Sequence, residues 1–176
     1  MKSNALILAA TLAFAVPALP CQAQQVLGQN DQLIHDAARM GNAQTVVQLL
    51  KQNPAMRDAR TGLGSTPLHL AATNPDIGPL KALLAAGANV NAEDADGATP
   101  LHMAAYTNRI ENAKALLEAG ADVHAQSSSG RTALMLARKS RADEIAGLIA
   151  LWVLKGCKAG GKCEQASTLD IDRLTK

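Results

Sequence analysis

One short motif recurs in this chain at a fixed interval. Thr-Pro-Leu-His occupies residues 66–69 and 99–102, and Thr-Ala-Leu-Met occupies 132–135, so the motif returns twice at a spacing of 33 residues. A degenerate copy stands at 33–35, displaced by 34 residues. A fixed period of this length is typical of a solenoid, in which each unit buries its apolar face only against its neighbours.

Each copy carries the signals of a helix-turn-helix unit. Thr66 and Thr99 are expected N-caps, because a threonine oxygen can accept a hydrogen bond from the free amides of the first helical turn. Pro67 and Pro100 follow at the first helical position, where the missing N–H is not needed. Leucines and alanines then recur at helical spacing, which predicts one buried face for each helix.

The second helix of each unit is expected to stop at a residue in the left-handed conformation. Gly87 and Gly120 occupy this place in the two best copies, and glycine adopts a positive φ without steric cost. In the first copy Asn53 stands there, followed by Pro54, and asparagine is the next-best choice.

The composition favours closely packed helices. The chain has 176 residues, of which 35 are alanine, whereas aromatic residues make up only 2%. Sandwiches and barrels need β-branched and aromatic residues in their strands, and small side chains suit helices that approach one another closely. A formal net charge of +2 provides no strong field to attract nucleic acid or an anionic membrane.

The repeated motifs resemble those of the ankyrin repeat. Its T-P-L-H-x-A-A signature stands at 66–72 and 99–105, and its L-L-x-x-G-A-x-V-N signature stands at 83–91. The resemblance covers residues 31–155 and implies an all-α solenoid of helix-turn-helix repeats with projecting β-hairpin-like turns. Four repeats are expected, at 31–63, 64–96, 97–129 and 130–155.

Departures from the ankyrin pattern carry structural predictions. Residues 73–76 read Thr-Asn-Pro-Asp where the family places a glycine between its helices, and proline cannot take a left-handed backbone. We therefore expect an irregular turn in repeat two and a second helix that begins at Pro79. In repeat four Arg138 replaces an alanine, as in a polar cap on a terminal unit. Trp152 is expected to seal the last helix.

The N-terminus has the pattern of a secretory signal peptide over residues 1–23. Lys2 precedes an uncharged apolar run at 5–16, which is too short to span a membrane. Small residues at Cys21 and Ala23 fit a cleavage site after Ala23.

Cleavage at this site predicts a periplasmic or secreted protein that is not attached to a membrane. We also expect the protein to be a monomer. A lead-in at 24–30 would then precede the repeats. The alternative is a lipoprotein acylated at Cys21, which Pro20 disfavours because lipoprotein signals place a small residue before the cysteine.

Two cysteines remain in the C-terminal tail, at residues 156–176. Cys157 and Cys163 enclose Lys-Ala-Gly-Gly-Lys, and in an exported protein such a pair is expected to form a structural disulfide. A redox role is the alternative, although the spacing is not that of a C-x-x-C motif.

The histidines could have a structural role or could be metal ligands repeated along the array, a metal ladder. His35, His69 and His102 occupy equivalent positions, but stacked helices lie about 8–10 Å apart, whereas a zinc–nitrogen bond is about 2.0–2.1 Å long. The ankyrin resemblance implies that this histidine hydrogen-bonds backbone near the turn, and the metal ladder remains the alternative.

Catalytic chemistry finds no support in the sequence. There is no nucleophile elbow, zinc-protease motif or phosphate-binding glycine loop. Glu93, Asp94 and Asp96 form an acidic turn that leaves calcium binding open as an alternative. We expect no catalytic residue, no cofactor and no metal.

The ankyrin resemblance instead implies a protein-binding surface at the hairpin tips and on the exposed side of each first helix. Tyr106, the only tyrosine, is expected to be exposed at the centre of the array, where a rigid ring can supply much contact area. The candidate residues are Arg60, Leu63, Ser65, Thr73, Asn74, Glu93, Asp96, Ala98, Tyr106, Thr107, Gln126, Ser129, Arg131, Lys139 and Ser140.

The sequence is thus interpreted as an exported, non-enzymatic ankyrin-repeat protein that binds another protein. It resembles small periplasmic ankyrin proteins of bacteria, some of which accompany catalases in peroxide defence, while others act as toxin-immunity proteins. The resemblance therefore implies a scaffold, an accessory factor or an inhibitor. A metal- or ligand-binding accessory protein is the alternative from another class.

Overall fold

The computed structural model describes residues 33–154. Within them, eight α-helices and one 3-10 helix alternate with turns, which confirms the predicted all-α repeat architecture. An isolated antiparallel bridge between Gln126 and Thr132 is the β-type pairing found in this part of the chain. The elements are α1 (Leu33–Met40), α2 (Ala43–Gln52), η2 (Pro54–Asp58), α3 (Pro67–Ala71), α4 (Gly78–Ala85), α5 (Pro100–Tyr106), α6 (Ile110–Glu118), α7 (Ala133–Lys139) and α8 (Asp143–Leu154).

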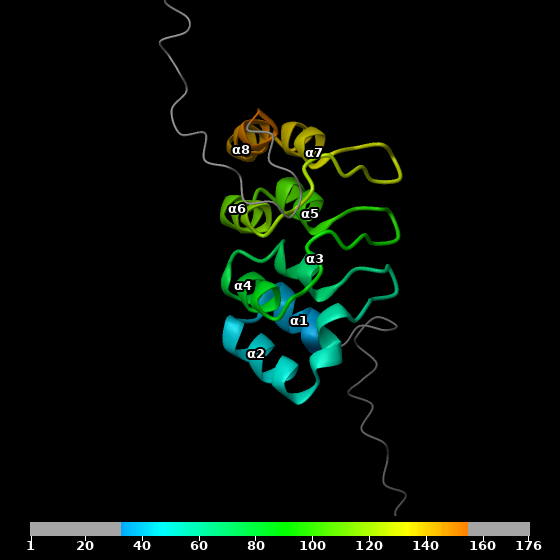
Figure 1. The fold of residues 1–176 in the computed structure, drawn as a ribbon, viewed down its shortest axis with the longest axis vertical. Coiled ribbons are helices and arrows are strands. Elements are labelled where there is room, and N and C mark those ends of the chain that lie inside the picture. The colour runs from blue at the N-terminus through cyan, green and yellow to red at the C-terminus, as the bar shows by residue number, and fades with distance from the viewer. Residues whose placement is uncertain (1–32, 155–176) are drawn as a thin grey trace, which may run out of the picture.

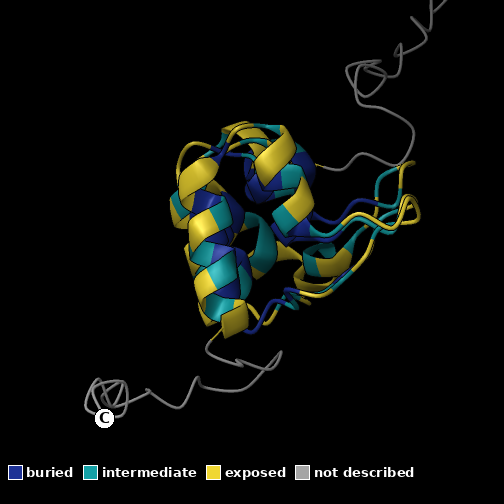
Figure 2. Cartoon of the chain, turned by 90° about the horizontal axis from the view of Figure 1, so that it is seen from above, coloured by how far each residue is buried: buried dark blue, intermediate teal, exposed yellow. Residues whose placement is uncertain are grey.

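The helices form two layers along the array (Figure 1). The first helices α1, α3, α5 and α7 pack on one another in order, and each also packs against the second helix of its own repeat. The segments that lead into α3, α5 and α7 project to one side as stacked hairpin-like turns, which overlie one another when the array is viewed from above (Figure 2). The first helices, and not the second, therefore lie beside the projecting turns.

Alanine side chains allow the first helices to approach one another. Ala71, Ala104, Ala105 and Ala137 are completely buried between successive repeats, as the excess of alanine predicts. Leucine and isoleucine fill the space between the two layers, and each such side chain contributes about 1.5–3 kcal/mol when it leaves water. The large fully buried aliphatic residues are Ile34, Leu68, Leu80, Leu83, Leu101, Leu116, Leu117, Ile145 and Ile149.

Helices α4 and α6 end at left-handed glycines, as predicted. Gly87 and Gly120 have φ angles of 80° and 94°. After α4, the Gly87 N–H donates to the Leu84 carbonyl at 2.9 Å and the Ala88 N–H donates to the Leu83 carbonyl at 3.1 Å. This pair of bonds is the Schellman motif, which satisfies carbonyls left without a partner at the end of the helix.

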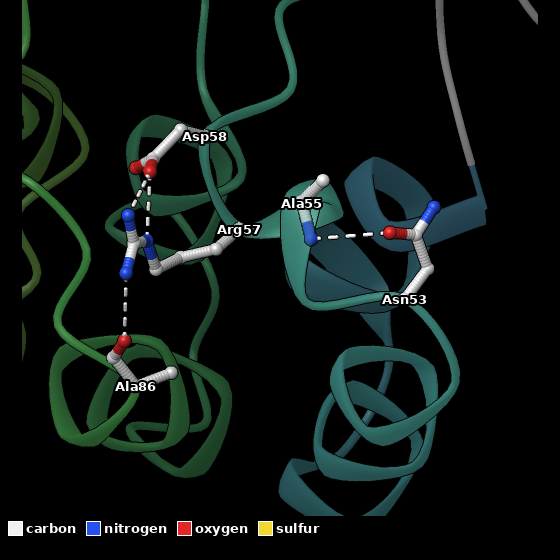
Figure 3. Close-up of polar contacts among 5 residues, drawn as sticks. All are labelled: Asn53, Ala55, Arg57, Asp58 and Ala86. Atoms are coloured by element: carbon white, nitrogen blue, oxygen red, sulfur yellow. Dashed lines mark hydrogen bonds and ion pairs between the residues drawn. The ribbon is translucent and has the colours of Figure 1, made fainter.

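The prediction for Asn53 is wrong. Its φ angle is −146°, and its side-chain oxygen accepts from the Ala55 N–H at 3.1 Å (Figure 3). Asn53 therefore caps η2, which begins at the next residue, and does not terminate α2 through a left-handed backbone. Arg57 in η2 donates to the Ala86 carbonyl at the end of α4 (3.2 Å) and pairs with Asp58 (Figure 3). This contact joins repeat one to repeat two.

The turn between α3 and α4 is irregular, as predicted from its proline. Pro75 stands where repeat three has Asn108, whose φ of 55° is left-handed. Because proline cannot adopt that conformation, α3 is shortened to five residues. The second helix begins at Gly78, one residue before the predicted start, and Pro79 lies in its first turn.

The ends of α1, α3 and α5 are each capped by a side chain of the following repeat. The buried Asn74 amide donates to the Ala38 carbonyl at the end of α1 (3.0 Å). The buried Asn112 amide donates to the Ala72 carbonyl at the end of α3 (3.1 Å). Ser140 donates in the same way to a carbonyl in the last turn of α5 (3.1 Å). Neighbouring repeats thus satisfy backbone acceptors that would otherwise be buried without a partner.

The fourth repeat closes the described part of the array. Its second helix, α8, has 12 residues, whereas α6 has nine. Trp152 is half-buried and packs against the core, and Arg138 is exposed, as predicted for a terminal unit. Met135 occupies the place that His102 holds in repeat three, and 55% of its surface is exposed because no further repeat covers it within residues 33–154.

Several predictions lie outside the described residues. The signal peptide at 1–23, with its alternative acylation at Cys21, and the pair Cys157 and Cys163 are all in this category. They stay predictions, as do the repeat boundaries. No helix in residues 33–154 is long and apolar enough to cross a bilayer.

Arg141 provides a test of helix termination. It has a φ of 56° after α7, a conformation that costs a residue other than glycine about 1–2 kcal/mol. We predict that Arg141→Gly raises the free energy of unfolding by about 0.5–1 kcal/mol, because the greater freedom of glycine in the unfolded chain offsets part of the gain. Urea denaturation measures the change.

The matched control is Arg138→Gly. It removes the same charge from the last turn of α7 and should lower the free energy of unfolding by up to about 1 kcal/mol. Equal destabilisation by both substitutions would contradict the assignment of Arg141 to a strained left-handed position.

Candidate functional site

The three hairpin turns form one continuous edge, and each turn takes the number of the repeat whose first helix it leads into: α3 for repeat two, α5 for repeat three and α7 for repeat four. The Ala95 N–H donates to the Leu63 carbonyl at 3.0 Å, and the Ser128 N–H donates to the Asp96 carbonyl at 2.8 Å. Each turn is therefore joined to the next by a backbone hydrogen bond between their tips. The stacked turns seen in Figure 2 therefore form one edge that is held together by hydrogen bonds, and they are not three independent loops.

Arg60 adds a second connection between the turns of repeats two and three. Its guanidinium donates to the carbonyls of Gly64 (2.8 Å) and Glu93 (2.6 Å). Although Arg60 is exposed, these bonds assign it a structural task that the sequence did not predict.

Buried histidines hold the turns against the first helices. The Thr66 N–H donates to Nδ1 of His69 at 3.1 Å, so Nε2 of His69 carries the proton and donates to the Ala98 carbonyl at 2.9 Å. His102 repeats the arrangement with the Thr99 N–H (3.1 Å) and the carbonyl of the following turn (2.9 Å). The histidine thus closes a capping box on its own helix and also binds the next repeat.

These contacts confirm the structural role implied for the histidines. Both ring nitrogens of His69 and of His102 already have backbone partners, so neither ring has a nitrogen available for a metal. Nε2 of His35 lies 3.2 Å from the Ala59 carbonyl. In residues 33–154 no three His, Cys, Asp or Glu side chains gather as a metal site would require.

Burial lowers the pKa of both His69 and His102. Desolvation of the charged ring is the main cause, and it outweighs the hydrogen bonds to the Ala98 and Arg131 carbonyls, which act in the opposite direction. The neutral ring is also the form that the geometry requires, since a protonated Nδ1 could no longer accept a backbone N–H.

The acidic turn of repeat three divides into structural and free carboxylates. One oxygen of Asp94 accepts from the Asp96 and Ala98 N–H groups, both at 2.9 Å. Asp94 therefore shapes the turn, which weakens the calcium alternative. Within residues 33–154 the carboxylates of Glu93 and Asp96 make no hydrogen bond or ion pair and remain exposed.

Nine of the fifteen candidate binding residues are exposed, and four more are half-buried. The half-buried ones are Thr73, Ala98, Thr107 and Ser140. The exposed ones are Arg60, Leu63, Glu93, Asp96, Tyr106, Gln126, Ser129, Arg131 and Lys139.

The expected exposure of Ser65 and Asn74 is wrong. Asn74 is 3% exposed because its side chain caps α1, and Ser65 is 9% exposed at the base of its turn. Thr107 and Ser140, which follow Asn74 in the same register, also direct their hydroxyls to carbonyls within the fold. This register position is structural in all three repeats.

Tyr106 is exposed, as predicted. It lies at the end of α5, in the middle of the array, with 61% of its surface accessible. Its neighbours in the same register are Thr73 and Lys139, and the Thr73 hydroxyl is bound to the Leu70 carbonyl at 2.7 Å. The described part of the chain offers the Tyr106 hydroxyl no partner, so the ring is available for contact.

Sequence reasoning missed a pocket beside α7. It has a volume of about 250 Å³, and Leu136 lines it together with Asp96, Ala98, Ser129 and Arg131. A signal was present in the sequence, because Leu136 follows Leu70 and Met103 at the repeat spacing. A pocket, however, depends on how two turns and a helix meet, and the spacing alone does not show that.

Comparison with known families agrees with this architecture. A family model described as ankyrin repeats, three copies, matches residues 34–127. The chain belongs to the ankyrin-repeat family. The matched residues contain the helices from α1 to α6, and the fourth unit of this ankyrin array, α7 with α8, follows them. Ankyrin repeats are protein-interaction modules, so the edge of hairpin turns and first helices is the candidate site for a protein partner.

The buried histidines predict that acid destabilises the array. Since folding lowers their pKa, the unfolded chain binds protons more readily than the folded one below about pH 6.5. We therefore expect the free energy of unfolding to fall between pH 7 and pH 5, by at most about 1.4 kcal/mol per pH unit for each histidine. Urea denaturation at several pH values measures the slope.

The variant His69→Gln/His102→Gln separates this effect from general acid denaturation. It should be less stable at pH 7 but should show a smaller loss between pH 7 and pH 5. His124→Gln is the control, because it makes the same substitution at a histidine that is exposed in a turn and forms no hydrogen bond between repeats within residues 33–154. An unaltered slope in the double variant would show that these histidines do not cause the acid sensitivity.

Proposed function

We propose that this protein binds another protein through the hairpin-turn edge and the adjoining first helices of repeats two to four, and that it is exported and has no enzymatic activity. One observation carries the proposal. The hairpin turns are joined to one another by backbone hydrogen bonds and to the first helices by His69 and His102, so they form one fixed edge, and several exposed side chains along this face have no partner in residues 33–154. They are Glu93, Asp96, Tyr106, Arg131 and Lys139.

The charge on this face supports recognition of a folded or extended polypeptide. Glu93 and Asp96 make the turn that leads into α5 acidic, while Arg131 and Lys139 make the first-helix side of repeat four basic. Such a polarised face orients a partner and disfavours a polymer of uniform charge, because one half of the face would repel it. Nucleic acid is therefore not the proposed partner.

The role of the complex is proposed as scaffold, accessory factor in peroxide defence, or inhibitor such as a toxin-immunity protein. A metal- or ligand-binding role receives less support, since the rings of His69 and His102 are fully bonded and Asp94 shapes its own turn. Mass spectrometry of a captured partner distinguishes a catalase from a toxin.

Tyr106→Ala tests the binding face. We predict that the tagged protein retrieves a discrete partner at near-stoichiometric yield, and that Tyr106→Ala reduces the yield at least about tenfold, as truncation of an aromatic hot spot does. Quantitative mass spectrometry measures the yield. Leu154→Ala is the control, because Leu154 is also exposed (83%) but lies at the end of α8 in the second layer.

Retention of the partner by Tyr106→Ala and loss by Leu154→Ala would place the binding face elsewhere. Circular dichroism of both variants checks that the helices are intact, because neither side chain is buried and neither substitution should unfold the array.

Export is tested by the mass of the chain recovered from cells. We predict a mature form that begins at Gln24, since cleavage after Ala23 removes the apolar run. The variant Ala23→Arg places a large charged residue before the cleavage site and should leave the precursor intact. A lipid-modified mass beginning at Cys21 would contradict cleavage after Ala23 and would assign the protein to a membrane.

A further inference from the structure

The pocket beside α7 combines an apolar base with a polar rim. It lies where the turns of repeats three and four meet the first helix of repeat four and has a volume of about 250 Å³. Leu136, from α7, is half-buried, as is Ala98. A hollow of this kind can remove one apolar side chain of a binding partner from water, which is the usual form of an interface anchor.

The serines on the rim are bonded to one another and to the backbone. The Ser127 and Ser129 hydroxyls lie 3.0 Å apart, and the Ser128 N–H donates to the Asp96 carbonyl. These bonds fix the shape of the turn and leave few polar groups directed at an occupant. Apart from its two charged side chains, the rim therefore places little restriction on which side chain of a partner can enter the pocket.

Those two charges have opposite signs and do not neutralise each other. Asp96 comes from the turn of repeat three, and Arg131 follows the turn of repeat four, and both line the same pocket. Within the described residues their charged groups form neither an ion pair nor a hydrogen bond. By contrast, Arg57 pairs with Asp58 and Arg60 donates to two carbonyls.

Each charge has a second like charge in its own repeat. Glu93 is exposed in the acidic turn, and Lys139 is exposed at the end of α7. These exposed carboxylates therefore belong to the turn of repeat three, and these exposed basic side chains belong to repeat four. A partner with a basic residue beside Asp96 and an acidic residue beside Arg131 would be attracted on both sides of the pocket.

We infer that this pocket receives an apolar side chain from a segment of the protein partner, flanked by a basic residue that pairs with Asp96 and an acidic residue that pairs with Arg131. The inference rests on the proposed protein-binding function and specifies the chemistry of the segment that the face recognises. Leu136 provides the apolar contact, and the two charges set the direction in which the segment lies across repeats three and four.

A library of random 12-residue peptides displayed on phage, selected on the purified protein, tests the inference. The expected result is enrichment of sequences with a basic residue, an apolar residue and an acidic residue in constant order. Synthetic peptides of the enriched sequence then give dissociation constants by calorimetry. Leu136→Ala should weaken binding about tenfold, as loss of an apolar anchor does.

Charge reversal provides the sharper test and does not alter the core. Asp96→Lys/Arg131→Glu should weaken the enriched peptide about tenfold, and a peptide with its basic and acidic residues exchanged should recover that loss. The matched control is Lys114→Glu/Glu118→Lys on α6, which also reverses two exposed charges without changing the net charge. It should leave both dissociation constants unchanged.

Two results would overturn the inference in different ways. Peptides that lose binding with Tyr106→Ala but are indifferent to charge reversal would reject the pocket and leave the protein-binding function standing. Failure to enrich any sequence would also reject recognition of a short segment. Capture of a partner from cells, which depends on whole folded proteins, tests the proposed function separately.

Discussion

The hydrogen bonds of the buried histidines join the helices, the hairpin turns and the neighbouring repeats to one another. Each ring of His69 and His102 accepts the backbone N–H of the threonine that begins its own helix and donates to a carbonyl in the turn of the next repeat. One side chain thus fixes the start of a helix, the base of a hairpin turn and the spacing between two repeats. Because the bond requires a neutral ring, the stacking of the repeats depends on the protonation state of groups buried within it.

The position of the proposed binding face is a consequence of this connection. The histidine holds the base of each turn, and backbone bonds between Ala95 and Leu63 and between Ser128 and Asp96 hold the tips. The turns are consequently fixed relative to one another and to the first helices. A surface that is already fixed lowers the entropic cost of binding, because little of it needs to be ordered when a partner arrives.

Burial determines which polar residues remain available to a partner. Asn74 and Asn112 cap the helices of the preceding repeat, and Arg60 joins two turns. Their polar groups are satisfied within the fold, as buried or cross-repeat groups must be. The side chains of Asp96, Arg131 and Tyr106 form no such bond within residues 33–154, and the proposed recognition surface is built on them.

Much of the fold could be predicted from the sequence, because the signals involved are local. The 33-residue spacing, the threonine–proline helix starts and the glycines at 87 and 120 each act through their own backbone. Pro75 predicted an irregular turn for the same reason. The prediction for Asn53 was wrong because the conformation of this residue depends on the next element of the chain. The 3-10 helix η2 occupies the place of the expected turn and uses the asparagine as its own cap.

The candidate site was predictable in outline only. The repeat register correctly predicted that Leu63, Asp96 and Tyr106 are exposed. It also predicted exposure for Asn74 and Ser65, which are buried in the structure. The sequence by itself determined the repeat and its capping residues, and it predicted the side of the array that is proposed to face a partner. The tertiary structure decided which side chains are consumed by neighbouring repeats and where two turns and a helix leave a pocket over Leu136. Such contacts join residues that are about one repeat apart in the sequence and adjacent in space, and no local backbone preference encodes them.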